Sequence, residues 1–200
     1  MKKVFFTLAV MAIMAVVPAS AQSVKFGVKG GINNTKLSLD IDELKAKSKM
    51  GWFIGPTLKI DLPILIGFDI AALYDQKKVG IDDESFTQKS IEIPINAKLN
   101  IDLAAGTGVF FALGPQFGFN VGKDEFNWKD KHDYQNTFQM KKSNFSINFG
   151  AGVKLIDHLE VGFTYNIALG KTGDLENLTA KQIKDDPKSK SWNLSAAYYF

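Results

Sequence analysis

The feature that most constrains the fold is an alternation of apolar and polar residues that recurs along almost the whole chain. In each repeat, alternate positions carry no charge and are mostly large and apolar, such as Phe145 and Phe149. The positions between them are polar or small, such as Asn148 and Gly150. A period of two residues is typical of a β-strand whose two faces meet different surroundings. We therefore expect an all-β chain with eight strands, at residues 24–32, 52–60, 66–74, 91–99, 109–119, 145–155, 159–169 and 192–200.

Two closed architectures fit eight alternating strands, and the size of the residues on the polar face distinguishes them. A soluble ligand-binding barrel buries its apolar face, whereas a membrane barrel turns that face toward lipid. Here the polar face is rich in glycine, as expected where side chains converge on a narrow lumen. A charge on the lipid face near the midplane costs roughly 2–4 kcal/mol, which explains a charge-free apolar face. The sequence thus favours an eight-stranded antiparallel up-and-down transmembrane β-barrel, with a soluble barrel as the alternative.

The connections between the expected strands alternate in length. The longer ones cover residues 33–49, 76–86, 122–142 and 171–190, and the shorter ones residues 61–65, 100–108 and 156–158. This pattern predicts four longer extracellular loops, with short turns and both termini in the periplasm. Pro56, Pro94 and Pro115 fall inside strands that have no free edge, so each predicts a bulge or a bend. The segment Asp174–Ile183 has the cap and apolar spacing of a short helix.

The N-terminus carries the three parts of a secretory signal peptide. Lys2 and Lys3 precede an apolar run over residues 4–17, and an Ala-Ser-Ala cleavage site ends at Ala21. The apolar run is shorter than the roughly 20 residues that span a bilayer, which argues against an uncleaved anchor. We therefore expect residues 1–21 to be removed and residues 22–200 to form a single barrel domain in the bacterial outer membrane.

The composition excludes several classes of function. All 24 basic residues are Lys, and the net charge of +3 falls to +1 without Lys2 and Lys3, which argues against nucleic-acid binding. The absence of Cys excludes disulfides, thiolate metal sites and Cys nucleophiles. His132 and His158 are expected at opposite rims, so they share no metal, and their spacing supports no Ser-His-acid arrangement. The acidic runs at 40–43 and 82–84 are interpreted as solvated loop charge rather than a Ca²⁺ site. We expect no catalytic residue, cofactor or metal.

Charged residues on the polar face are expected to meet inside the barrel. They are Lys25, Lys29, Lys59, Asp69, Asp75, Glu92, Lys98, Lys154 and Glu160. Unpaired charges in a narrow interior are costly, so lysines should pair with acids. Eight strands leave an interior just wide enough for side chains. We therefore favour a polar plug that fills the bore and fixes strand register, with an ion pathway as the alternative.

Several stretches resemble the outer-membrane β-barrel family of Bacteroidetes, known as porin-family or PorT-like proteins. They are GFDIAALYDQK, SIEIPINAKL, FFALGPQFGF, FGAGVKL, LEVGFTYNIALG and the aromatic end WNLSAAYYF. The resemblance covers essentially the whole mature chain and implies a barrel of the OmpA/OmpX type. It also implies that the last strand, with Tyr198 and Phe200, is the signal that the outer-membrane assembly machinery recognises. The alternative is that these aromatic residues only contact lipid.

These observations favour a non-enzymatic role. We expect a structural, interaction or accessory protein that contacts outer-membrane lipid, the assembly machinery during biogenesis, and a protein partner through its loops or rims. A PorT-like member would serve a secretion or assembly system. A narrow porin-like channel is the alternative, and an outer-membrane enzyme that modifies lipid is a more distant one.

Overall fold

The computed structural model describes the β-strands of the chain and most of the short turns between them. The described residues are 23–38, 46–63, 65–81, 84–104, 106–122, 125–129, 135–140, 143–169, 173–176 and 188–200. The predicted signal peptide lies outside these residues and stays a prediction. The strands are β1 (Ser23–Ser38), β2 (Ala46–Asp61), β3 (Ile66–Ala71), β4 (Leu73–Ile81), β5 (Glu84–Ala104), β6 (Thr107–Asn120), β7 (Glu125–Lys129), β8 (Gln135–Met140), β9 (Ser143–Ile156), β10 (Leu159–Ala168), β11 (Gly173–Glu176) and β12 (Lys188–Tyr199). No described segment is a helix long and apolar enough to cross a membrane.

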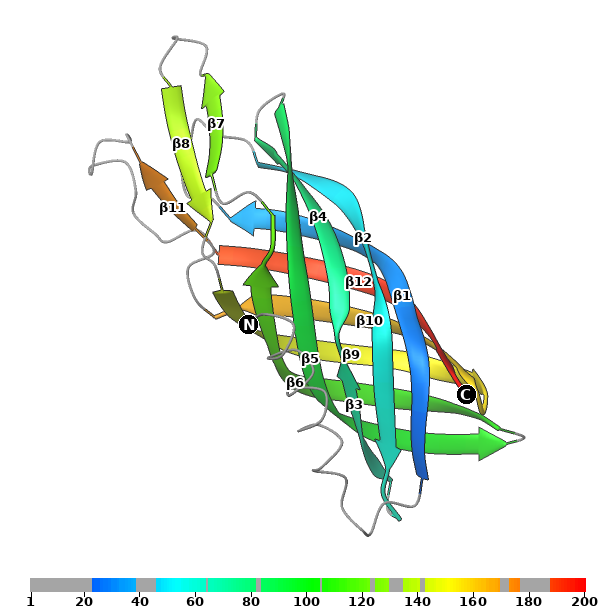
Figure 1. Ribbon diagram of the computed structural model, residues 1–200. Helices are drawn as coiled ribbons and strands as arrows, with labels where there is room; N and C mark the ends of the chain where they lie inside the picture. The colour runs from blue at the N-terminus through cyan, green and yellow to red at the C-terminus, as the bar shows by residue number, and fades with distance from the viewer. Residues whose placement is uncertain are drawn as a thin grey trace.

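The main sheet closes on itself as an antiparallel barrel (Figure 1). Its order runs β1-β12-β10-β9-β6-β5, continues through β3 and β4, and returns through β2 to β1. The strands β3 and β4 lie end to end and act as one strand interrupted at Ala72, which makes eight strands around the wall. The predicted eight-stranded barrel is confirmed. Closure leaves the main sheet without an edge, so the backbone groups of the wall pair with one another, as a lipid environment requires.

The strands are longer than their apolar alternation. Residues 76–86 were expected to form a long loop, but β4 and β5 remain paired as far as Ile81 opposite Glu84. The expected loop is wrong because pairing of β4 with β5 needs only backbone hydrogen bonds. These bonds do not require the apolar alternation from which the strands were predicted. We call this end of the barrel the long-loop end. The other end, where short connections join β2 to β3, β5 to β6 and β9 to β10, is the short-turn end.

The three prolines interrupt hydrogen-bond ladders without shifting the register. Pro56 of β2 lies next to the break at Ala72, whose N–H donates to the Pro56 carbonyl at 3.0 Å. Between Pro94–Gln116 and Ala97–Leu113, the β5–β6 ladder lacks two pairs, and Pro115 lies in this gap. The register shifts lie elsewhere, next to Lys49, Asp102 and Leu159. Of the two predicted features, a bulge at each proline is wrong, and a bend stays a prediction. A missing N–H removes a bond without adding a residue.

A second, three-stranded sheet lies beyond the long-loop end of the barrel (Figure 1). β7 and β8 come from the connection between β6 and β9, whereas β11 comes from the connection between β10 and β12. β8 is the central strand, so this sheet joins two separate loops. The expected helix from Asp174 is wrong in its first residues, which belong to β11, and the rest of that segment lies outside the described residues.

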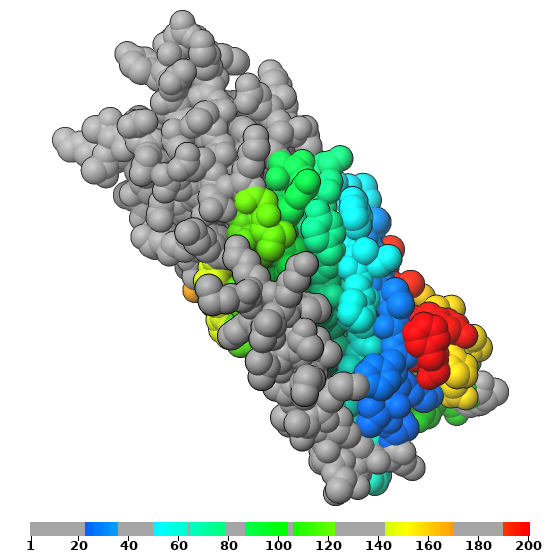
Figure 2. Space-filling view, in the orientation of Figure 1, coloured from blue at the N-terminus to red at the C-terminus, as the bar shows by residue number. Residues whose placement is uncertain are grey.

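The outer wall of the barrel is apolar and exposed. Phe111 and Leu113 are each 53% exposed, and Phe149 and Phe163 are each 50% exposed. By register, Leu58 and Ile60 share this face but are almost fully covered. The outer surface runs without interruption from β12 in red to β1 in blue (Figure 2). Such a surface suits lipid acyl chains, whereas large contiguous apolar patches are rare on soluble monomers.

Candidate functional site

The interior of the barrel is the only strongly charged and buried region among the described residues. Because successive residues of a strand face opposite sides, the strands that turn apolar residues outward turn the charged residues between them inward. Eight of the nine interior residues predicted from the sequence lie in two charged clusters and one ion pair at the rim. Lys25 is the exception, because its ammonium group donates to the Asp157 carbonyl at the exposed short-turn rim, at 3.3 Å. The rim pair is Lys154 with Asp102, a direct ion pair at the short-turn end.

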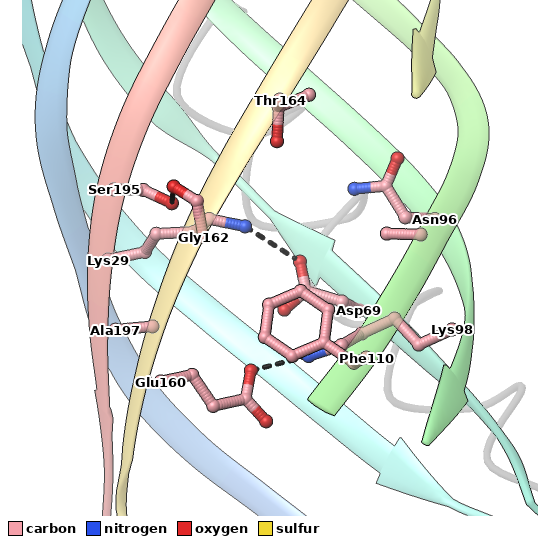
Figure 3. Close-up of a pocket in the computed structure, with 11 residues that line it drawn as sticks. Lys29, Asp69, Asn96, Lys98, Phe110, Glu160, Gly162, Thr164, Ser195 and Ala197 are labelled. Atoms are coloured by element: carbon pink, nitrogen blue, oxygen red, sulfur yellow. Dashed lines mark hydrogen bonds and ion pairs between the residues drawn. The ribbon is translucent and has the colours of Figure 1, made fainter. Parts of the chain in front are cut away.

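The inner cluster comprises Lys29, Lys59, Asp61, Asp69, Lys98, Glu160 and Tyr199. Glu160 on β10 receives the ammonium groups of Lys59 at 2.8 Å and of Lys98 in a direct contact. Asp69 on β3 accepts a hydrogen bond from Lys29 at 3.3 Å (Figure 3). It also accepts one from the Tyr199 hydroxyl at 2.7 Å. Lys59 also lies 3.6 Å from Asp61. Apart from Lys59 with Asp61, which lie on the same strand, these contacts join strands that are not neighbours in the wall, so the side chains reach across the bore.

An aromatic ring completes the inner cluster. The Lys98 ammonium lies 3.9 Å from the centre of the Phe110 ring, a cation–π distance (Figure 3). Gly152 makes room for this ring, because a Cβ there would come within 2.4 Å of the Phe110 Cζ. The cavity that remains beside these groups measures about 20 Å³, which is room for about one water molecule.

The outer cluster comprises Asn33, Asp75, Lys77 and Glu92, toward the long-loop end. Lys77 donates to Glu92 at 2.7 Å and lies 3.5 Å from Asp75. Glu92 also accepts from Ser90 at 2.8 Å and from Gln116 at 2.9 Å. Asn33 donates to Asp75 at 2.6 Å. Every member is at least nine-tenths buried, so this cluster closes the bore a second time.

A network of amide side chains lies beside the outer cluster. Asn148 donates to Gln116 at 3.0 Å and to Asn96 at 3.3 Å, and Asn166 donates to Asn148 at 2.7 Å and to Ser146 at 2.8 Å. On the other side of the lumen, Phe53, Ala71 and Leu73 form a small apolar cluster. Between the inner and the outer cluster the lumen is thus filled by side chains, and most of their buried polar atoms are hydrogen-bonded to one another.

The short-turn end holds a wider, open hollow of about 420 Å³. Its walls include Lys59, Asp61, Asn100, Asp102 and Lys154. Ser23 donates to Asp61 at 3.2 Å, so the first described residue is fastened to this rim. The hollow ends at Lys59, one of the inner-cluster lysines, and so leads to the plugged part of the lumen.

The C-terminal residues point alternately out of and into the barrel. Tyr198 and Phe200, the predicted assembly signal, are 49% and 73% exposed on the outer wall. Tyr199 between them is fully buried and reaches Asp69. The Tyr199 carbonyl oxygen lies 2.8 Å from His158 Nδ1. The backbone N–H of Tyr199 donates to the His158 carbonyl at 2.8 Å. The last strand is therefore held both in the lumen and at the short-turn rim.

Sequence reasoning missed several interior groups that strand parity would have found, among them Lys77, Tyr199 and Phe110. Lys77 follows Asp75 by two residues, but the segment was assigned to a loop. Tyr199 follows the lumen-facing Ala197 by two residues, and Phe110 precedes the lumen-facing Ala112 by two. Both aromatic residues are apolar and therefore do not look like residues of the polar lumen face. Their position in the strand, and not their polarity, decides which face they occupy.

The other candidate residues from the sequence do not form a site in the described part of the chain. His132 lies outside the described residues, as do most of the acidic runs at 40–43 and 82–84. His158 contacts only backbone and the ring of Tyr198, stacked at 6.0 Å. Among the described residues, no three His, Cys, Asp or Glu side chains are arranged to hold a metal ion.

Comparison with known proteins agrees with this architecture. Residues 20–173 match the family model described as "Outer membrane protein beta-barrel domain". Neisserial surface protein A has a similar structure with a TM-score of 0.50 and 11% identity, covering 90% of this chain and 100% of that one. The attachment invasion locus protein of Yersinia pestis, at 14% identity and TM-score 0.47, covers 90% and 100%. Outer membrane protein W of E. coli, at 15% and 0.43, covers 89% and 98%. No curated protein sequence matches significantly.

The family match covers more than half of the chain, so the protein belongs to the outer-membrane β-barrel domain family. The family is one of outer-membrane proteins, so the location is the bacterial outer membrane, as the sequence predicted. The structural likenesses concern the fold alone at these identities.

Proposed function

We propose that this protein is a closed outer-membrane barrel with a structural or accessory role, which it performs by presenting its loops to a protein partner. The single observation that carries the proposal is the filled lumen. Two charged clusters and an amide network occupy the bore, and the inner cavity beside them has room for about one water molecule. A narrow channel, the alternative, needs a continuous wetted path, and paired buried charges oppose one.

The small sheet beyond the long-loop end supports an interaction role. β8 pairs with β11, so two loops that are far apart in sequence share one hydrogen-bonded unit. A loop region ordered in this way loses less conformational freedom on binding than separate loops would. The barrel then acts as the membrane anchor that positions this region at the cell surface.

Two narrower assignments belong to the same proposal. The stretches quoted from the sequence support membership of the PorT-like group of Bacteroidetes, whose members would serve a secretion or assembly system. The order of a charged, an apolar and a small-residue region within residues 1–21 supports a cleaved signal peptide. We further propose that Tyr198 and Phe200 are read by the assembly machinery, because both side chains remain accessible on the outer wall.

Site-directed crosslinking tests the interaction role. Because the protein has no native Cys, the reagent attaches only at the introduced residue. A Lys131→Cys variant carries a photoactivatable thiol reagent between β7 and β8, whereas an Asp157→Cys variant carries it on the exposed turn at the other end. We expect discrete protein adducts in native outer membranes from the first variant and few from the second. Adducts from neither variant, or equally from both, would contradict a partner specific to the loops.

A further inference from the structure

Three buried oxygen atoms in the outer half of the lumen have no hydrogen-bond donor. They are Asn33 Oδ1, Thr35 Oγ1 and Asn193 Oδ1, and no other buried side-chain atom of the described residues shares this condition. Asn33 and Thr35 are at least 98% buried. A buried acceptor without a donor is destabilising, so native proteins satisfy such atoms with water or an ion.

The three oxygens belong to one corner of the bore. Asn33 on β1 stands opposite Asn193 on β12, and Thr35 is two residues further along the same face of β1. Opposite residues in an antiparallel pair have Cβ atoms about 5 Å apart. Gly51 on β2 is the other neighbour of Asn33 in the wall and offers no side-chain donor to it. Asn33 Oδ1 packs against this glycine, where a Cβ would lie 2.6 Å from the oxygen.

The same corner has an excess of negative charge among the described side chains. Asn33 donates to Asp75, and Asp75 shares the single ammonium group of Lys77 with Glu92. Lys77 is 2.7 Å from Glu92 but 3.5 Å from Asp75, so Asp75 is the less well neutralised carboxylate. The inner cluster differs, since its three lysines face three acids.

We propose that a partly dehydrated alkali-metal cation binds in this corner of the lumen. Asn33, Thr35 and Asn193 supply neutral oxygens, and Asp75 supplies the charge that a monovalent ion balances. Hard cations take oxygen ligands, and arrays of neutral oxygens replace the hydration shell of alkali ions in proteins. This inference goes beyond the proposed function: the ion is a fixed component of the outer cluster that joins β1, β12 and β4.

The test is the cation dependence of unfolding for the full mature barrel folded in lipid vesicles. Urea unfolding is followed at constant ionic strength while N-methylglucamine chloride is replaced stepwise by NaCl or KCl. Binding to the folded state alone multiplies the folding equilibrium constant by one plus the ratio of ion concentration to dissociation constant, so the constant rises about elevenfold at ten times the dissociation constant. We expect this rise for at least one of the two ions, with broadening of the ²³Na resonance if Na⁺ is preferred.

Variants assign the effect to the corner. Asp75→Asn should abolish the alkali-specific rise. The isosteric Thr35→Val should weaken binding, so that the same rise needs a severalfold higher ion concentration. Asp102→Asn, at the opposite end, is the matched control and should leave the rise unchanged. If Asp75→Asn does not fold, the wild-type titration still shows whether an alkali ion binds. Thr35→Val then shows whether the ion binds in this corner.

Two results would overturn the proposal. One is unfolding of the wild-type barrel that is insensitive to replacing N-methylglucamine by either alkali ion, as expected if water alone satisfies the oxygens. The other is an alkali-specific rise that Asp75→Asn and Thr35→Val both leave unchanged, because the ion would then bind outside this corner.

Discussion

At the scale of single residues, the lumen shows why buried charges are tolerated in a narrow barrel. Each acid of the inner cluster has a lysine or hydroxyl donor, and Glu160 has two ammonium groups. Such pairs add little net stability compared with apolar packing, but removing one partner leaves a buried charge uncompensated. The consequence is asymmetry: single substitutions should be harmful, and paired ones should be tolerated better.

Glu160→Gln tests this asymmetry. The change leaves Lys59 and Lys98 without their shared carboxylate, so we expect the free energy of unfolding to fall by about 3 kcal/mol. Adding Lys98→Met removes one orphaned charge and should restore part of that loss, with a coupling energy of about 1 kcal/mol or more. Urea unfolding of the single and double variants in vesicles measures both. Strictly additive effects would show that the two side chains do not interact.

Tyr199→Phe tests the link between the last strand and the lumen. The variant keeps the ring but removes the hydroxyl that donates to the buried Asp69, so stability should fall by about 2 kcal/mol. Tyr198→Phe is the control, because this ring lies on the lipid-facing wall and should tolerate the loss of its hydroxyl. Equal effects of the two substitutions would mean that the bond to Asp69 contributes nothing to closing the barrel.

At the scale of elements, each strand is a two-sided unit whose outer side is set by lipid. The penalty for a charge on that side depends on depth in the membrane. Phe149 lies in the middle of β9, whereas Leu155 lies near its end at the short-turn rim, and both are about half exposed. The same substitution at these two positions therefore measures the position of the membrane along the strand.

We expect Phe149→Lys to lower the free energy of unfolding in bilayers by roughly 2–4 kcal/mol and Leu155→Lys to lower it by roughly 0–1 kcal/mol. The measurement is equilibrium unfolding of both variants in the same vesicles. Similar small losses at the two positions would contradict the lipid-facing assignment of this wall and favour a water-exposed surface.

The sequence was sufficient for the fold but only partly so for the interior. The apolar alternation at Phe145–Leu155 and in the other strands follows directly from contact with lipid, so it predicted all eight strands. The alternation does not predict where a strand such as β4 ends, at Ile81, because strand pairing there depends on backbone hydrogen bonds and not on an apolar face. It also could not specify partners: that Glu160 meets Lys59 and Lys98 depends on the stagger between distant strands. Tyr199 and Phe110 were missed because apolar character alone does not identify the face.

At the scale of the whole molecule, the barrel has two unlike ends. One carries the short turns and the C-terminus, and the other carries the sheet of β7, β8 and β11 (Figure 1). The alternation of connection lengths predicts that the second end is extracellular.

Thiol labelling of intact cells tests this orientation. A membrane-impermeant maleimide should label Lys131→Cys before lysis and Asp157→Cys only after the outer membrane is ruptured. The protein has no native Cys, so background labelling comes from other proteins alone and is separated by gel mobility. The reverse order of labelling would invert the proposed topology.

The central claim is that the lumen is closed, and single-channel recording tests it most directly. The folded wild-type barrel is reconstituted into a planar bilayer, and a general porin added afterwards to the same bilayer shows that open channels are detectable. Because paired side chains fill the bore, we predict no discrete current steps from the wild-type protein. Reproducible steps whose ion selectivity changes in Glu160→Gln would contradict the closed lumen and establish a conducting path.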